Sequence, residues 1–391
     1  FLADLTSGSR IFSRKFVGMK RTPLKAAMIG GGINSAVGRS HEIALRLDNA
    51  FELVAGCFSR NPQINSRSAE AYQVSPQRVY VSLEKLLEVE RTELDAVVIA
   101  TPITAHASQI ATVLDAGLAV ICDKPLVANS AECAALLAKV SGDSTRLFSV
   151  FNYTGYQAVR EIKHRVEAGE IGSIFKIMAE MPQDSYLRLK NADKIDAIQP
   201  WRLVDGDVPC LSLDLFAHIH SLVNFITGLN PLAVMAHSRA ISQVSAGLID
   251  EVDALIEYEQ GMVVNAWYGK VALGSRNGLK LRVYGTHGSF EWFQEQPEQI
   301  IHANAIGDRV LLDRISSTSS VTPENRYNRF KAGHPAGFIE AFANYYFDIA
   351  RAIHDGVLNE YTLSAEVAAQ GIALSGAIER ASSLRQEVKL G

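Results

Sequence analysis

Between residues 24 and 153, short apolar runs alternate with amphipathic stretches of helical length. This alternation is typical of βαβ units, in which helices join parallel strands. Strands are predicted over residues 24–30, 51–58, 78–81, 94–101, 119–122 and 147–152. Helices are predicted over residues 36–47, 66–72, 83–90, 106–116 and 130–140. The run 96–100 is continuously apolar, as in a strand covered on both faces, so the sheet is expected to be doubly wound.

After residue 153 the strands become longer, with alternating polar and apolar positions. This period of two predicts a largely antiparallel sheet with one covered face. The expected strands span residues 173–181, 232–239, 252–259, 262–271, 279–284 and 289–295. Helices are expected over residues 156–167, 211–227, 335–354 and 364–385, and a polar, mobile loop over 316–323.

The two patterns predict an α/β fold with two domains. Residues 1–22 are interpreted as an N-terminal extension and residues 23–153 as a domain with a doubly wound parallel sheet. Residues 154–391 are expected to form an α+β domain with a large, mostly antiparallel open sheet, whose terminal helices pack back on the first domain. A chain of 391 residues that is 48% hydrophobic is long enough for two cores.

Charge and cysteine usage narrow the class of partner. The net charge of -4, without a basic run, argues against nucleic acid. No apolar run reaches the roughly 18 residues that cross a bilayer, and the first 20 residues lack the apolar core of a secretory signal, so no membrane partner is expected. The scattered residues Cys57, Cys122, Cys133 and Cys210 are interpreted as buried thiols in a reducing, cytoplasmic setting, with no metal site.

The strand 24–30 runs into a glycine cluster and then into a helical pattern. Gly30 and Gly32 allow the backbone to approach a pyrophosphate, and the helix N-terminus offers free N–H donors. A third glycine is expected at position 35, where the chain has Ser35, and the next glycine is Gly38. The arrangement is typical of a Rossmann dinucleotide site, in which Ile33 is also expected to contact the cofactor. A plain turn is the alternative.

The second strand ends in Ser59 and Arg60, where an NAD site usually carries an acid. A small residue followed by arginine leaves room and charge for a 2'-phosphate. The cofactor is therefore predicted to be NAD or NADP, with a preference for NADP. An arginine that is solvated or stacks on adenine is the alternative.

The fourth predicted strand ends in Thr101 and Pro102, with His106 four residues beyond. Carboxyl ends of strands face the ligand crevice in such sheets, so these residues are expected beside the cofactor. His106 could equally begin a helix without a chemical role.

The next strand ends in Asp123 and Lys124, again at the crevice, where both are expected to contact the cofactor. A partly desolvated lysine there can donate a hydrogen bond to a substrate hydroxyl. Without the other motifs, Lys124 would be interpreted as an ordinary surface lysine. Asp214 and His218 are four residues apart in the predicted helix 211–227 and share one face. Imidazole can take a hydroxyl proton near neutral pH, whereas an ordinary surface pair is the alternative. His220 points elsewhere and is interpreted as structural.

Taken together and in order, these motifs resemble the Gfo/Idh/MocA oxidoreductase family from residue 24 to the C-terminus. The motifs that carry the resemblance are Ile29-Gly-Gly-Gly32 with Gly38, Ala100-Thr-Pro102 with His106, Asp123-Lys-Pro125, Trp201-Arg202 and Asp214-x-x-x-His218. The resemblance implies that Lys124 is the catalytic lysine, that Asp214 binds or orients substrate and that His218 is the acid/base. It also implies that Trp201 and Arg202 shape the substrate pocket.

Residues 151–156 and 333–338 resemble the branch that acts on sugars and cyclic polyols. Tyr153 and Tyr156 are therefore candidate pocket aromatics, with core tyrosines as the equal alternative. Two positions depart from the family pattern: Asp123 replaces a glutamate, and Phe216 stands where the family prefers glycine.

The sequence thus predicts an NAD(P)-dependent oxidoreductase acting on a secondary alcohol or ketone of a sugar, inositol or related polyol. The alternatives are a regulator that binds the cofactor without turnover and a glycosidase that uses nicotinamide transiently. The exposed face of the second sheet predicts a homodimer or homotetramer.

Overall fold

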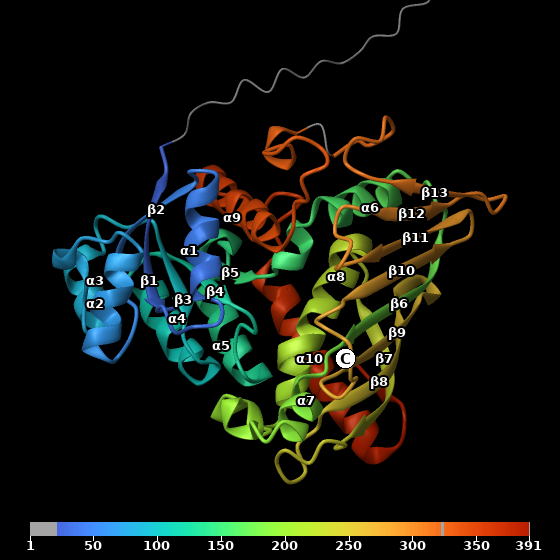
Figure 1. Cartoon of the computed structure of the whole chain (residues 1–391), viewed down its shortest axis with the longest axis horizontal. Coiled ribbons are helices and arrows are strands. Elements are labelled where there is room, and N and C mark those ends of the chain that lie inside the picture. The colour runs from blue at the N-terminus through green and yellow to red at the C-terminus, as the bar shows by residue number, and fades with distance from the viewer. Residues whose placement is uncertain (1–21, 322–323, 391) are drawn as a thin grey trace, which may run out of the picture.

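The computed structural model describes residues 22–321 and 324–390, and Figure 1 shows two units side by side. The first unit contains a five-stranded parallel sheet in the order β2-β1-β3-β4-β5. Its strands are β1 (Leu24–Gly30), β2 (Phe51–Cys57), β3 (Ala96–Ala100), β4 (Ala119–Asp123) and β5 (Leu147–Val150). Every residue of β3 is buried, as the apolar run predicts. The predicted extension, residues 1–22, lies outside the described residues except for residue 22.

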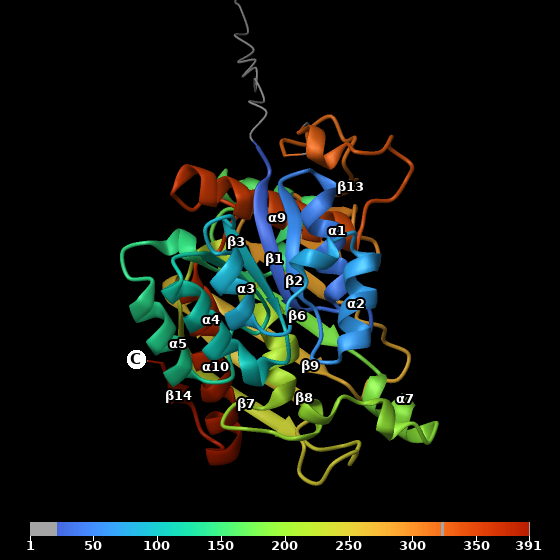
Figure 2. The same cartoon turned by 90° about the vertical axis from the view of Figure 1, so that its left-hand side faces the viewer.

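Five helices connect these strands and surround the sheet (Figures 1 and 2). Their bounds are α1 (Gly38–Leu47), α2 (Pro62–Ala71), α3 (Leu83–Glu90), α4 (His106–Asp115) and α5 (Ser130–Lys139). Helix α2 begins four residues before the prediction, because the Asn61 side chain accepts the amide of Ile64 at 3.0 Å and Pro62 occupies the first helical position.

The strand predicted over residues 78–81 is wrong. Residues Pro76–Arg78 form a 3-10 turn, and only Val79 makes a single parallel bridge, to Gly56 of β2. Val81 is 80% exposed, and Ser82 already caps α3. The apolar run is too short for a strand because it lies between a proline turn and a helix start.

The second unit is built on a nine-stranded sheet in the order β13-β12-β11-β10-β6-β9-β8-β7-β14. The strands are β6 (Ile174–Pro182), β7 (Pro231–Arg239), β8 (Glu251–Tyr258), β9 (Val263–Gly269), β10 (Lys280–Gly285), β11 (Gly288–Phe293), β12 (Ile300–Ala303), β13 (Arg309–Leu312) and β14 (Val388–Lys389). The pairing of β6 with β9 is parallel and the other pairs are antiparallel. The predicted fold class, α/β with a mostly antiparallel second sheet, is confirmed.

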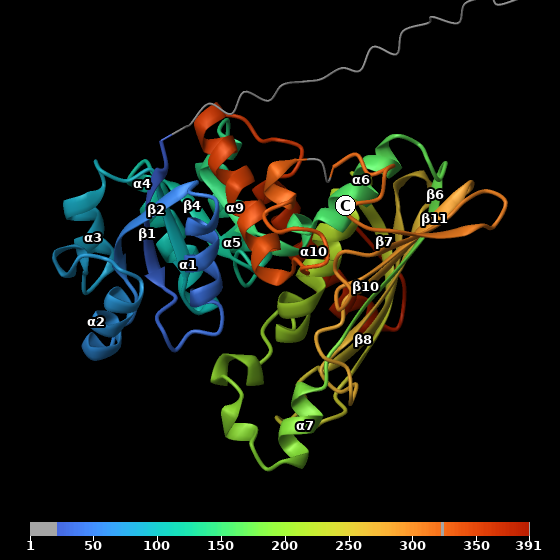
Figure 3. The same cartoon turned by 45° about the horizontal axis from the view of Figure 1, so that its top comes forward.

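Three helices lie between the inner face of this sheet and the first unit (Figures 1 and 3). They are α6 (Gln157–Glu167), α8 (Ala217–Thr227) and α10 (Ala365–Leu384). The inward residues of β8 are buried at alternate positions, whereas Leu255 points outward and is 39% exposed. No helix covers the outer face in Figures 1 and 3.

Several elements lie outside the predicted set. Strands β12, β13 and β14 have two to four residues each, too short for a clear period of two. Helix α7 (Ser185–Asn191) projects from the second unit in Figures 2 and 3. It belongs to a lobe whose small core contains Tyr186, Ile198 and Leu248. Of the predicted loop 316–323, residues 322 and 323 lie outside the described residues.

The C-terminal region completes the first unit. Helix α9 (Phe338–Asp355) lies along α1 (Figure 3). On α1, His41 is fully buried, with its ring 5.4 Å from that of Phe342 and its Nδ1 2.7 Å from the Tyr346 hydroxyl. Tyr346 also packs edge-on against Phe51 of β2, with ring centroids 5.9 Å apart.

Within residues 22–321 and 324–390, no helix is both long and apolar enough to span a membrane.

Candidate active site

A cavity of about 730 Å³ runs along the carboxyl ends of the first sheet toward the second unit. The glycine turn after β1 and the residues after β2 line one end. The other end is lined by Lys124, Trp201, Arg202 and Asp214. Doubly wound sheets bind ligands at this edge, and the volume is typical of a cofactor site.

The glycine turn can exist only with glycine at two of its positions. Gly30 has φ +72°, and a Cβ there would lie 2.6 Å from the Ala100 oxygen. At Gly38, the first residue of α1, a Cβ would overlap the Gly31 carbonyl. Helix α1 therefore packs directly on the turn. Gly38 takes the place of the missing third glycine in this packing.

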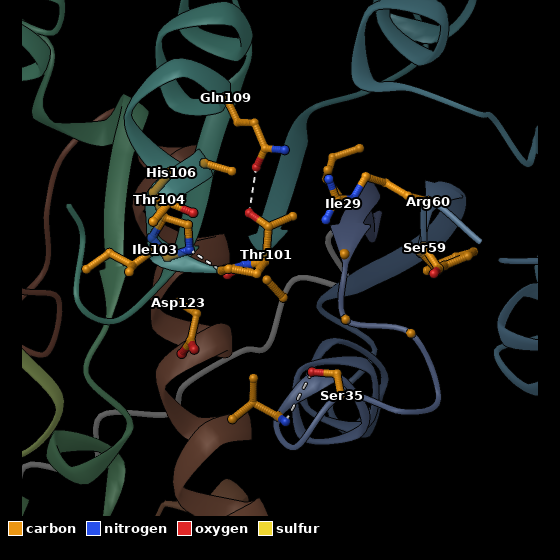
Figure 4. A pocket seen from close by; sticks show the side chains of 18 of the residues that line it. Ile29, Ser35, Ser59, Arg60, Thr101, Ile103, Thr104, His106, Gln109 and Asp123 are labelled. Carbon is orange, nitrogen blue, oxygen red and sulfur yellow. Dashed lines mark hydrogen bonds between the residues drawn. The ribbon is translucent and has the colours of Figure 1, made fainter. Parts of the chain in front are cut away.

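Backbone amides remain available at this end of the cavity. Gly32, Asn34 and Ala36 line it, and their amides donate to no acceptor within the described residues. The Ser35 Oγ instead accepts the amide of Val37 at 3.4 Å (Figure 4) and that of Gly38, the first residue of α1, at 3.1 Å. Free amides beside close-approach glycines fit a dinucleotide pyrophosphate.

The contact of Ile33 with the cofactor stays a prediction. The Ile33 amide donates to Ser68 Oγ at 3.0 Å, and Ile33 is not among the residues that line the cavity.

Ser59 and Arg60 line the cavity where β2 ends, as predicted. The Asn65 carboxamide oxygen accepts the amides of Phe58 and Ser59, which fixes the backbone there. Arg60 is exposed and forms no ion pair with any described residue.

Thr101, Pro102 and His106 also line the cavity, as predicted. Both nitrogens of the His106 ring are engaged: Nε2 is 2.8 Å from the Thr101 oxygen, and Nδ1 is 3.1 Å from the Pro125 oxygen (Figure 4). His106 is buried and links the turns after β3 and β4. This is a bracing role for the imidazole.

Asp123 lines the cavity at the end of β4, with its carboxylate 3.4 Å from Nε2 of His41. Burial acts to raise the pKa of Asp123, but His41 and then Lys124 lower it below the ordinary value. Tyr346, His41 and Asp123 therefore form a chain of contacts that ends at the residue before Lys124.

The carboxylate of Asp214 links the two units because it forms ion pairs with three cationic side chains. Its Oδ1 accepts Lys124 Nζ at 2.9 Å, and its Oδ2 accepts Lys270 Nζ at 2.6 Å and an Arg202 guanidinium N–H. Burial acts to raise the pKa of Asp214, but Lys124, Lys270 and Arg202 hold it well below the ordinary value. The carboxylate is therefore ionised.

A π-helical turn, Ser212–Phe216, carries Asp214 into the site ahead of α8. The Ala217 amide bonds back to the Ser212 oxygen, five residues earlier. The Asp214 carbonyl accepts Lys124 Nζ at 2.7 Å, so lysine binds both backbone and side chain of this residue. Such turns occur often at functional sites.

His218 is buried, and its ring lies edge-on to Tyr153 with centroids 4.4 Å apart. Burial, and then the charge of Lys124, lowers the pKa of His218 well below its ordinary value, although Asp214 acts in the opposite direction. The ring is neutral near pH 7 and can accept a proton. Its Nδ1 has no hydrogen-bond partner within the described residues.

Tyr153, Tyr156 and His218 are not among the residues that line the main cavity. Tyr153 braces His218 and accepts an N–H from Asn277 at 3.3 Å. Tyr156 packs between Tyr153 and Trp292, with ring centroids 5.9 and 5.1 Å away. Its burial favours the alternative of a core tyrosine, and a contact with substrate stays a prediction.

Sequence reasoning missed Lys270 and Gln199. Lys270 follows β9 and is only 4% exposed. Positions 264, 266 and 268 are buried, so the alternation places residue 270 inward as well, and an inward lysine signals a buried partner. Gln199 lines the cavity, and its Oε1 accepts N–H groups of Trp201 and Arg202.

No group of three or more His, Cys, Asp or Glu residues in the described parts of the chain is arranged to hold a metal ion.

Comparison with known proteins gives two family matches. Residues 24–151 match the family model described as "Oxidoreductase family, NAD-binding Rossmann fold", and residues 159–291 match "GFO/IDH/MocA C-terminal domain". The uncharacterized oxidoreductase YfiI of Bacillus subtilis is 28% identical over 358 residues, 89% of this chain and 88% of its own. Levoglucosan dehydrogenase of Pseudarthrobacter phenanthrenivorans is 23% identical over 73% of this chain and 78% of its own.

Among solved structures, an inositol dehydrogenase homolog from Azotobacter vinelandii, complexed with NADH and myo-inositol, superposes with a TM-score of 0.85 at 26% identity. The match covers 94% of this chain and 98% of that one. Together the two family matches cover more than half of the chain, and one falls in each of its two units. The chain therefore belongs to the Gfo/Idh/MocA family of oxidoreductases, with an NAD-binding Rossmann domain at its N-terminal end.

Proposed function

We propose that this protein is an NAD(P)-dependent dehydrogenase that acts on the secondary alcohol or ketone of a sugar, inositol or related polyol. The observation that carries the proposal is the contact of Lys124 with Asp214 at the end of the cavity opposite the glycine turn. That contact brings a lysine of the cofactor domain and an acid of the second domain together where a substrate carbon would meet the nicotinamide. The substrates named for the inositol and levoglucosan dehydrogenases support the polyol class.

Each site residue has a separate role in the proposed oxidation of an alcohol. When bound, nicotinamide supplies the acceptor for the hydride that leaves the carbon. His218 takes the hydroxyl proton, which its neutral form allows. Lys124 donates a hydrogen bond to the substrate oxygen, where negative charge develops. Asp214 holds Lys124 in place through its carboxylate and carbonyl.

The test is a panel of sugars and inositols with NAD and NADP, followed at the absorbance of the reduced nicotinamide. Lys124→Ala and His218→Ala are each expected to lower kcat by about 10² to 10⁴-fold while cofactor affinity stays within a few-fold. Lys139→Ala is the control, because the Lys139 side chain is exposed at the end of α5. Near-normal turnover in both site variants would contradict the assigned roles. Glycoside cleavage without net cofactor reduction would instead favour the glycosidase.

We further propose that NADP is preferred over NAD. The support is the chain's own Ser59 and Arg60, which line the cavity where β2 ends, at the position where an NAD site usually carries an acid. Arg60→Ala is expected to raise KM for NADP by about tenfold and to change KM for NAD little, since a charge-assisted hydrogen bond contributes about that much. Equal effects on both cofactors would leave Arg60 with a stacking role only.

We also propose that the two domains divide between residues 153 and 154. We propose in addition that the protein forms a homodimer or homotetramer through the outer face of the nine-stranded sheet. Outward residues of two neighbouring strands, Met235 and Leu255, pair in register and are 51% and 39% exposed. The four cysteines are buried and unpaired, which supports the cytoplasmic location that we propose.

A further inference from the structure

The substrate end of the cavity holds more positive than negative charge. Lys124, Arg202 and Lys270 all converge on the single carboxylate of Asp214. Their side chains are 15%, 26% and 5% exposed, so water screens them little.

The neighbouring titratable groups do not balance this excess. His218 is neutral because burial, and then Lys124, lowers its pKa well below the ordinary value. Asp123 is the other acid near Lys124 in the lining, and His41 lies 3.4 Å from its carboxylate. With Asp123 counted in full, three cations still face two acids, because the nearby carboxylate of Asp205 accepts the backbone amides of Cys210 and Ile249 instead.

A charge that is removed from water is unfavourable unless a partner of opposite charge neutralises it. The hydroxyls of a neutral sugar accept hydrogen bonds but bring no charge. From the three cations on Asp214 we infer that the substrate of the proposed dehydrogenase is a sugar acid, whose single carboxylate binds at Arg202, while Lys124 keeps its remaining N–H for the reacting oxygen. This inference rests on the proposed function and names its substrate class.

Arg202 is built to meet a planar anion. Its guanidinium lies 4.5 Å from the centroid of the Trp201 ring, which fixes the plane of the fork. Its Nη1 donates to Asp214 and its Nε donates to Gln199, whereas Nη2 donates to neither of these residues. At the cavity wall, Nη2 is therefore the guanidinium nitrogen that can give a charge-assisted hydrogen bond to a ligand carboxylate.

Lys270 supplies its charge without lining the cavity. It donates to Asp214 Oδ2 at 2.6 Å and lies 5.3 Å from the centroid of the Tyr186 ring, outside the lining residues. It therefore offsets the charge of Asp214, so that Arg202 and Lys124 can offer theirs to the ligand. A monoanion matches the remaining excess of one charge better than a phosphate dianion.

The experiment compares substrates that differ only in the end group. Initial rates are measured with NAD and NADP for D-glucuronate against D-glucose, and for D-gluconate against D-glucitol, with D-glucose 6-phosphate as the phosphate arm. We expect kcat/KM for the acid of at least one pair to exceed that of its neutral partner by about tenfold or more. Raised ionic strength should increase KM for the acid and leave KM for the neutral partner unchanged.

Variants of Lys270 separate the charge effect from folding. Lys270→Met should lower the acid-to-neutral ratio by about tenfold, whereas Lys270→Arg should retain it. Lys280→Met, on β10 of the same sheet, is the matched control and should leave the ratio unchanged. Asp214 keeps two cationic partners in Lys270→Met, so that variant is expected to fold.

A binding arm distinguishes failure of this inference from failure of the proposed function. Calorimetric titration of the NADH-loaded protein with D-gluconate and with D-glucitol measures preference without turnover. Tighter binding of gluconate without turnover of any compound would support the acid site and overturn the dehydrogenase. Turnover in which every neutral sugar equals or exceeds its acid, or a preference for the phosphate arm, would overturn the inference and leave the dehydrogenase standing.

Discussion

His218 and His220 lie two residues apart on one helix, but their surroundings differ. His218 packs against Tyr153 and feels the charges of Lys124 and Asp214. His220 is fully buried, and its Nε2 lies 3.1 Å from the Val367 oxygen on α10. Burial lowers the pKa of both, so both are neutral near pH 7. One neutral ring serves the proposed chemistry and the other serves packing.

The pH dependence of oxidation is the first prediction. The proton acceptor is neutral His218, whose pKa in the free protein lies well below 6.5. As pH falls from 7.5 through 6.5, kcat/KM for alcohol oxidation should therefore show no acid limb assignable to this residue. A pH profile of wild type and His218→Gln checks this. A limb centred near pH 6.5 that disappears in the variant would contradict it.

The second prediction concerns acid stability and His220, whose pKa burial lowers to about 4. Between pH 6.5 and 4 the unfolded chain binds a proton that the folded protein excludes. The neutral, buried His220 therefore contributes roughly 3 kcal/mol to the free energy of unfolding above pH 6.5. This contribution is lost as the pH falls toward 4.

Urea unfolding at pH 7 and pH 4.5 measures this loss. The difference between the two pH values should be smaller in His220→Asn by about 2 kcal/mol. His354→Asn, exposed at the end of α9, should behave as wild type. An unchanged pH difference in His220→Asn would show that His220 titrates normally in the folded state.

At residue scale, a strand end and helix spacing point to Lys124 and Asp214, whereas Trp201 and Arg202 follow only from the family resemblance. The sequence could not show that all the cations meet on one carboxylate. Lys270 reaches Asp214 from the end of a strand 56 residues away. Local patterns carry no information on such a meeting, although the inward register of residue 270 was a usable signal.

At the scale of elements, the turn between β1 and α1 is the most constrained junction. The Tyr72 hydroxyl donates to the Gly31 oxygen at 2.8 Å and holds the turn from α2. A Cβ on Gly38 would overlap that same carbonyl group. The helix cannot move away without losing the burial of His41 beneath α9.

The third prediction follows from this packing. Gly38→Ala should lower the free energy of unfolding by about 1 to 3 kcal/mol, as overpacking does, and should weaken cofactor binding. Gly376→Ala on α10 is the control, because a Cβ there meets only ordinary contacts at 3.5 Å or more. Alanine should stabilise that helix by roughly 0.5 to 1 kcal/mol. Thermal melts with and without NAD compare the two, and equal stability of both variants would refute the packing argument.

Most longer elements were predictable because each has a strong period. The apolar run of β3 and the alternation of β8 both reappear as burial patterns. The failures have local causes: the proline turn at Pro76–Arg78 replaces a strand, and α7 packs on a small core of its own instead of on the main one. The π turn at Ser212–Phe216 leaves no trace in a pattern of period 3.6.

At the scale of the whole molecule, the two sheets differ in how they are covered. Helices surround the first, whereas the outer face of the second has none in Figures 1 and 3. Its outward positions mix apolar residues such as Met235 and Leu255 with charged ones such as Arg282 and Glu180. An open apolar sheet face is a frequent site of self-association.

The fourth prediction is that Leu255→Lys weakens the proposed oligomer. A buried charge at a symmetric interface occurs once per subunit and is unfavourable each time. Leu47→Lys is the matched control, because Leu47 is equally exposed, at 39%, but lies on α1. Sedimentation velocity should show dissociation at low micromolar concentration for Leu255→Lys only. A monomeric wild type would refute the interface.

The contact between α1 and α9 also has a consequence for biosynthesis. The parallel sheet and its first five helices leave the ribosome long before residues 338–355 exist. Until then the α1 face that carries His41 has nothing to pack against, and Phe51 lacks Tyr346 as its neighbour. The nascent nucleotide domain therefore presents an apolar surface throughout synthesis of the second domain, a state that invites chaperone binding. Its folding ends only when the C-terminal part of the chain closes that surface.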